Sequence, residues 1–221
     1  MMPKPTDFIV ASFLTAYPDN YFCDSLKDIL NCQKPKGIDS FYLELKSYIE
    51  TPQKLNNLRS DYIDIFDHGK EINSPYETSY GPYKGMNKTI DLSDLMGFYK
   101  AFGFELGVDD KRRDMADHVS VELEFYALLL MKEAYLKKHN DKEGTEIVLD
   151  ACKKFLKDHL GRFISAIGNR PAVLQHSFYS KVFEWSAVLV AEECKRLNVT
   201  PTPLSYDSLI SESEDFNCRF K

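Results

Sequence analysis

Apolar residues recur at helical spacing along almost the whole chain, and no segment of four or more strictly alternating residues is bounded by hairpin turn signals. A helix needs apolar side chains at every third or fourth position, whereas a half-buried strand needs them at every second one. The pattern therefore predicts an all-α fold, a bundle of about eight to ten helices. We expect helices near residues 7–17, 21–32, 38–50, 53–67, 91–102, 115–139, 144–167 and 171–197.

Prolines separate the early predicted helices. Pro18, Pro35 and Pro52 fall between them, and proline disfavours helical geometry in the residue before it. The helix predicted at 115–139 differs from the others because it is apolar on more than one side. We therefore expect it to run through the middle of the bundle.

A polar run at residues 107–114 divides the predicted helices into two groups. We expect an N-terminal helical part at 1–108, a hinge at 109–118 and a C-terminal helical part at 119–200. A short hinge permits domain exchange, so a monomer and a domain-exchanged dimer both stay open. Residues 201–221 carry four acidic side chains and are expected to form an acidic, mobile tail.

Residues 73–89 lack helical periodicity and are expected to form an ordered aromatic loop, with Tyr76, Tyr80 and Tyr83 in its first part. Loops of this length are uncommon inside compact domains unless they are functional or disordered, and three tyrosines argue against disorder. Two interpretations stay open. The rings receive a partner, or they plug the core with their hydroxyl groups in water.

The net charge of the chain indicates which kinds of partner it can bind. The chain carries 28 Lys and Arg against 34 Asp and Glu, a formal net charge of −6. Proteins that bind duplex nucleic acid present a basic face to the phosphates, so we expect no nucleic-acid partner. A cationic partner is electrostatically easier.

The cysteines and the apolar runs bear on the compartment. The five cysteines include no C-x-x-C pair, which favours a reducing, cytoplasmic location over a disulfide framework. The apolar runs at 8–14 and 125–131 are too short to span a bilayer. We expect a soluble protein without stable membrane insertion, whose first apolar run is a core helix and not a signal peptide.

The common catalytic templates are missing from the sequence. It contains no G-x-x-x-x-G-K-[ST] or G-x-G-x-x-G phosphate loop and no G-x-S-x-G nucleophile elbow, and none of its five histidines has a Glu three residues before it. That last pairing is the one that builds di-iron centres in helical bundles. The sequence therefore predicts no enzyme, no cofactor and no metal site.

One polar cluster stands at the start of the helix predicted at 115–139. Asp114 and Asp117 lie where the helix dipole favours negative charge, and His118 and Glu122 are four residues apart on one face. The cluster is either a recognition site or a solvated surface group. A third possibility is a small helical enzyme that uses His118 as acid and base beside Asp117, although no feature identifies its substrate.

The residues of this cluster resemble a known family. The string D-H-V-S-V-E-L-E-F at 117–125 is similar to the signature of the TorD/DmsD/NarJ family of molybdoenzyme assembly chaperones, also called redox enzyme maturation proteins. The segments at 74–80, 94–104 and 155–163 resemble further family segments in the same order. Asp114, Ala116 and Phe163 stand where the family pattern has Glu, Pro and Trp.

The resemblance implies a TorD-like bundle and a function. Members are cytoplasmic, system-specific chaperones that bind the apo catalytic subunit of a molybdopterin oxidoreductase of the DMSO reductase family. They commonly hold its N-terminal region or twin-arginine signal peptide and assist cofactor insertion before export. A generic scaffold for another protein helix is the alternative.

A receptor for such a peptide needs carboxylates for arginine and aromatic rings for the apolar helix. The residues expected to bind the client or its signal peptide are Asp114, Asp117, His118, Glu122, Tyr76, Tyr80 and Tyr83.

Overall fold

The computed structural model describes residues 4–32, 35–67, 73–81, 88–106 and 115–204, and these residues form the predicted all-α fold. None of them lies in a named strand, and their one β-type contact is an isolated antiparallel bridge between Tyr76 and His118. Residues 109–114 of the predicted hinge at 109–118 and residues 205–221 of the predicted tail at 201–221 lie outside the described residues. The division into two helical parts stays a prediction.

The elements in chain order are α1 (Pro5–Thr15), α2 (Phe22–Cys32), α3 (Tyr42–Glu50), α4 (Pro52–Tyr62), the π-helical turn η1 (Ile63–Asp67), the 3₁₀ turn η2 (Glu77–Ser79), α5 (Lys88–Ala101), α6 (Val119–Lys138), α7 (Lys142–Asp158), α8 (Leu160–Gly168), α9 (Pro171–Gln175) and α10 (Ser177–Leu197).

Most of the predicted helices shift by a few residues in the structure, and three of them break or begin at a histidine. The helix expected at 144–167 breaks at His159, whose φ of −127° and ψ of −101° are not helical. The helix expected at 171–197 breaks at His176, whose ring accepts the Tyr179 amide and caps α10. The helix expected at 115–139 starts at Val119 because His118 caps it. Apolar periodicity continues through all three positions, so it does not show these breaks.

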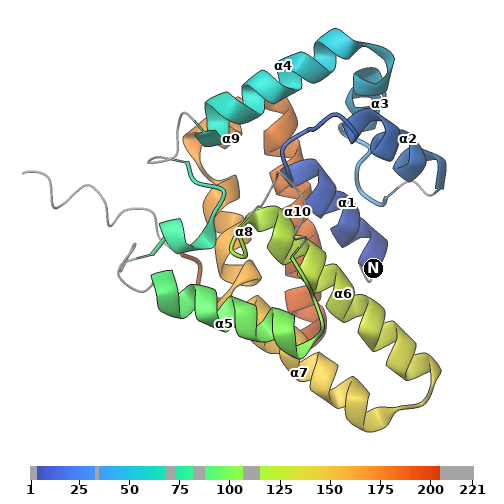
Figure 1. Ribbon diagram of the computed structural model, residues 1–221, viewed down its shortest axis with the longest axis vertical. Helices are drawn as coiled ribbons and strands as arrows, with labels where there is room; N and C mark the ends of the chain where they lie inside the picture. The colour runs from blue at the N-terminus through green and yellow to red at the C-terminus, as the bar shows by residue number, and fades with distance from the viewer. Residues whose placement is uncertain (1–3, 33–34, 68–72, 82–87, 107–114, 205–221) are drawn as a thin grey trace, which may run out of the picture.

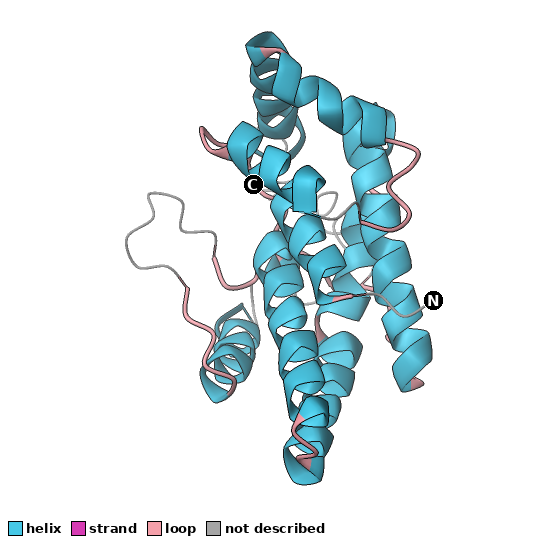
Figure 2. Cartoon of the chain, turned by 90° about the vertical axis from the view of Figure 1, so that its right-hand side faces the viewer, coloured by secondary structure: helices cyan, strands magenta, loops and turns pink. Residues whose placement is uncertain are grey.

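α6, the helix that is apolar on more than one side, runs through the middle of the bundle, as its pattern predicted. α6 lies between α1 and α7, and α10 packs on α8 and α1 (Figures 1 and 2). Phe8 of α1 contacts Tyr126 of α6 with 4.9 Å between ring centroids. The buried apolar side chains of all these helices form one continuous core.

A buried ion pair network joins α6 to α10 in the same core. Arg196 donates two hydrogen bonds of 2.9 Å to the carboxylate of Glu133 and further ones to Glu193. Tyr126 donates to Glu193 at 2.8 Å. Each buried carboxylate is thus paired with a guanidinium, which offsets the cost of removing it from water.

No helix within the described residues is both long enough and apolar enough to cross a membrane.

Candidate functional site

Residues 73–81, which we call the latch loop, cross the N-terminal end of α6. The Glu77 amide donates to the Asp117 carbonyl at 2.8 Å, and the Val119 amide donates to the Pro75 carbonyl at 3.0 Å. These two bonds form the bridge between Tyr76 and His118. The predicted aromatic loop and the predicted polar cluster therefore meet, although about forty residues of chain separate them.

Asp117 is completely buried beneath the latch loop. Its Oδ2 accepts hydrogen bonds from the Thr78 hydroxyl at 2.6 Å and from the Thr78 amide at 3.3 Å. Its Oδ1 has no hydrogen-bond partner among the described residues. The carboxyl group thus holds the loop with one oxygen and leaves the other unsatisfied.

His118, 1% exposed, is the N-cap of α6. The Ser120 amide donates to its Nδ1 at 3.2 Å, and the Ser120 hydroxyl lies 2.7 Å from the same atom. An amide can only donate, so Nδ1 carries no proton, and Nε2 donates to the Tyr62 hydroxyl at 3.1 Å. The imidazole is therefore neutral, and a substrate has no access to it in this structure.

Glu122 lies one turn further along α6 and is also completely buried. Neither of its carboxyl oxygens has a hydrogen-bond partner among the described residues. Burial raises the pKa of Glu122 well above its usual range, and the neighbouring Glu77 and Asp117 carboxyls raise it further. The interpretation of His118 and Glu122 as a solvated surface pair is wrong, because both side chains are buried.

His159, in the break between α7 and α8, ties the latch loop to the rest of the bundle. Its Nδ1 lies 3.0 Å from Glu77 Oε2, and its Nε2 lies 3.1 Å from Asp94 Oδ2 on α5. Burial acts to lower the pKa of His159, but the hydrogen bonds and charges of Glu77 and Asp94 outweigh it and raise the pKa. The histidine thus bridges two carboxylates as a cation.

Glu77, Asp94 and His159 were not among the residues predicted for the site. Each lies in one of the segments that resemble the family, at 74–80, 94–104 and 155–163. That coincidence is the signal that points to them, since helical periodicity alone carries no information on which polar residues face each other.

The predicted tyrosines are half-buried where the structure describes them. The Tyr76 ring stands edge-on to the His118 ring with 5.2 Å between centroids. Tyr80 donates to the Ser74 carbonyl at 2.7 Å and packs on Phe163. These packed positions agree with the interpretation in which the tyrosine rings fill the space between the loop and the core. Tyr83 and Asp114 lie outside the described residues.

The cluster presents hydrogen-bond acceptors that have no partner among the described residues. Among the described residues, no group of three or more His, Cys, Asp and Glu side chains is placed to hold a metal ion. What the site offers is two buried carboxyl groups with unsatisfied oxygens, Asp117 beneath a loop held by a few hydrogen bonds and Glu122 one turn further along α6. Such acceptors fit a cationic donor.

Sequence comparisons relate this chain to known proteins. A family model described as nitrate reductase delta subunit matches residues 32–169, which include the latch loop, the start of α6 and His159. The chain is 32% identical over 110 residues to the chlorate reductase assembly chaperone protein of Ideonella dechloratans, covering 48% of this chain and 53% of that protein. It is 31% identical over 115 residues to the selenate reductase assembly chaperone protein of Thauera selenatis, covering 51% and 56%.

The matched regions thus span about half the length of each of these curated relatives. Both relatives are named as assembly chaperones and not as enzymes. The family model, in contrast, covers more than half of this chain and contains all four segments that carried the resemblance. The chain therefore belongs to the nitrate reductase delta subunit family, which is the TorD/NarJ family of assembly chaperones.

Proposed function

We propose that this protein is an assembly chaperone for a molybdopterin oxidoreductase of the DMSO reductase family. It binds the apo catalytic subunit in the cytoplasm, through the N-terminal region or twin-arginine signal peptide of that subunit, and holds it until the cofactor is inserted. The names of the relatives support the general role. The observation that carries the proposal is the pair of buried carboxyl groups, Asp117 and Glu122, that retain unsatisfied oxygens at the start of α6.

Asp117 Oδ1 offers the acceptor that a guanidinium group needs, and Glu122 offers it once the proton that burial keeps on its carboxyl is lost. An arginine side chain donates in a planar fork that matches a carboxylate, and such charge-assisted bonds are stronger than neutral ones. Access requires the latch loop to lift, which breaks hydrogen bonds that contribute about 0.5–1.5 kcal/mol each. The half-buried rings of Tyr76 and Tyr80 would then line the opening and contact the apolar part of the peptide.

The first experiment asks whether the client exists. The tagged protein is recovered from its native cells, and the proteins retained with it are identified by mass spectrometry and analysed for molybdenum. We expect the catalytic subunit of a molybdopterin oxidoreductase, with little bound metal. Retention of unrelated helical proteins without any oxidoreductase would favour the generic scaffold and contradict the proposal.

The second experiment tests the site. Asp117→Asn removes a charge with little change in shape, and we expect it to weaken retention of the catalytic subunit and of its N-terminal peptide. A matched control is Asp150→Asn, because Asp150 is an exposed residue of α7 whose pair with Lys154 is also exposed and contributes little. A lower melting temperature with unchanged retention would reduce Asp117 to a structural residue at the start of the helix.

A further inference from the structure

A groove of about 610 Å³ lies between the C-terminal end of α5 and the hairpin of α6 and α7. We call it the hairpin groove. Met131, which lines it, follows Val119 by twelve residues, or about 18 Å along the axis of α6. The groove is therefore separate from the contact between the latch loop and the start of α6.

Exposed apolar side chains gather in the hairpin groove. Met131 and Tyr135 on α6 are 45% and 62% exposed, and Ile147 on α7 is 57% exposed. Single exposed apolar residues need no explanation, but three in one concave surface indicate a binding site. The volume of the groove falls within the range of about 300–1,000 Å³ that small-molecule sites have.

The shape of the groove is held by packing within the protein. Phe102, at the α5 side, packs on Phe125 of α6 with 6.3 Å between ring centroids. Near the turn between α6 and α7, a Cβ on Gly144 would lie 3.0 Å from Leu136 Cδ2. The backbone of α7 thus lies against the Leu136 side chain. A ligand would meet a surface that is already formed, which lowers the entropy cost of binding.

Among the described residues that line the groove, Lys132 is the only one that carries a charge. Its side chain is half-buried and makes no hydrogen bond or ion pair within the described part of the chain. Lysines nearby on the same two helices do have partners, since Lys137 pairs with Glu133 and Lys154 with Asp150. A cation that is partly removed from water without a partner costs free energy, which an anion beside it would offset.

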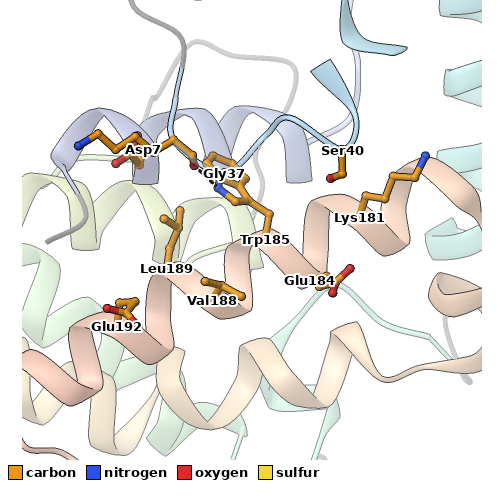
Figure 3. A pocket seen from close by; sticks show the side chains of 10 residues that line it. Asp7, Gly37, Ser40, Lys181, Glu184, Trp185, Val188, Leu189 and Glu192 are labelled. Carbon is orange, nitrogen blue, oxygen red and sulfur yellow. Dashed lines mark hydrogen bonds between the residues drawn. The ribbon is translucent and has the colours of Figure 1, made fainter. Parts of the chain in front are cut away.

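Another groove, along α10, differs in its charges (Figure 3). The charged residues that line it are Asp7, Lys36, Lys181, Glu184 and Glu192. Lys181 is already paired with Glu44 at 3.1 Å. Charges of both signs do not select one kind of ligand, whereas the single cation of the hairpin groove does.

We infer that the hairpin groove binds a small amphipathic carboxylate, whose alkyl chain lies against Met131, Tyr135 and Ile147 and whose head group pairs with the Lys132 ammonium. A lysine is a compact charge with three donors, which a single carboxylate can pair with. A doubly charged phosphate monoester would keep one charge without a partner in apolar surroundings. The inference goes beyond the proposed function and does not depend on it.

The binding experiment compares three probes of one chain length, octanoate, octanol and octylamine, each below the concentration at which it forms micelles. Isothermal titration calorimetry at pH 8 gives the affinities. We expect octanoate to bind, octanol to bind about fivefold more weakly because it lacks the ion pair, and octylamine to bind least. Equal affinities of the three probes would show that the groove selects no charge and would contradict the inference.

The length of the chain tests the apolar part of the groove. From hexanoate to octanoate to decanoate, each pair of added methylenes should strengthen binding about tenfold until the chain fills the groove. An affinity that does not depend on chain length would mean that Lys132 binds the head group alone, which also contradicts the inference.

The location is read from the methyl groups of the six methionines, labelled with ¹³C. Met131→Leu identifies the resonance of Met131. Octanoate should shift this resonance and leave that of Met115, which is also exposed but does not line the groove. An unchanged Met131 resonance during binding would place the ligand elsewhere and overturn the inference.

The variants separate charge from shape. Lys132→Met removes the charge and keeps an unbranched side chain, so it should lower the affinity for octanoate to that for octanol. Ile147→Asp should weaken both probes, because it introduces a charge into the apolar contact. Lys153→Met, at an exposed position of α7 outside the groove, is the control. Equal octanoate affinities of all three variants, with unchanged melting temperatures, would contradict the inference.

A lipid bilayer offers similar chemistry, so flotation with vesicles of anionic phospholipid is the last arm. Protein that floats with the vesicles through Lys132 but takes up no octanoate would make the groove a membrane contact and overturn the inference. Lys132→Met should not change retention of the oxidoreductase subunit. The proposed function and this inference can therefore fail separately.

Discussion

A carboxyl group that is buried without a partner destabilises the folded state unless it keeps its proton. Glu122 is such a group, since burial raises its pKa and neither oxygen is hydrogen-bonded within the described residues. An acid whose pKa is higher in the folded than in the unfolded state stabilises the fold below the unfolded value of about 4.3. That contribution is lost as the pH rises through the folded pKa.

Relative to the native form, Glu122→Gln should therefore become more stable as the pH rises from 4 to 8, by about 1.4 kcal/mol for each pH unit between the unfolded and the folded pKa, because the amide does not titrate. The advantage should shrink toward pH 4, where both forms are neutral at this position. Chemical denaturation at several pH values measures it. A constant difference between the two proteins across that range would show that Glu122 does not titrate as described.

His159 differs from Glu122 because its charged form has hydrogen-bond partners. Its contacts with Glu77 and Asp94 raise its pKa, so the cation stabilises the fold fully below the unfolded value of about 6.5. Stability is lost as the pH rises through the higher folded pKa. His159→Gln should remove this loss and cost about 1.5–3 kcal/mol at pH 6. The exposed His139→Gln is the control, and a similar effect of both changes on the melting curves would contradict the prediction.

At the scale of elements, the latch loop and the start of α6 depend on each other. Thr78 is the side chain that joins them, through its 2.6 Å hydrogen bond to Asp117. Thr78→Val keeps the shape and removes the bond, so we expect a loss of about 1–3 kcal/mol. The amides of Glu77 and Val119, which pair across the same contact, should exchange with deuterium faster. Exchange that is unchanged there but faster throughout the bundle would mean that the loop does not open separately.

The same variant bears on the client site. If the latch loop covers the acceptors of Asp117 and Glu122, weakening it should increase retention of the client peptide while it lowers stability. Reduced retention would instead favour a role for the closed loop itself as the binding surface.

The spacing of apolar residues was enough to predict most of the helices, but not the points at which they break. Periodicity located α2 and the run of α4 and η1 well, and it identified α6 as central. It missed the breaks at His159 and His176, where the backbone is not helical although apolar residues continue at helical spacing. Burial of His118 and Glu122 could not be predicted either, since it depends on contacts with segments that are distant in sequence. The resemblance to the family pointed to the segments at 74–80 and 117–125 together, but it did not show how they contact each other.

At the scale of the whole molecule, the core does not stop at the predicted boundary between the two parts. Phe8 packs on Tyr126, and α1 lies between α6 and α10 in sequence-distant contact. We therefore expect one cooperative unfolding transition. Helix loss by circular dichroism and the fluorescence of Trp185 should give the same midpoint. Two separated midpoints would show that the parts unfold independently.

The long sequence separation of the latch contacts has a consequence for how the protein forms. The bond between Thr78 and Asp117 closes a stretch of 39 residues that includes α5, whereas the hairpin of α6 and α7 forms from neighbours. Closing the longer stretch costs more chain entropy and is repaid only once α6 exists. In refolding followed by pulsed deuterium labelling, the Glu77 amide should therefore become protected after those of α6 and α7. A newly made chain would then pass through a stage in which its bundle is built while its buried acids still face water.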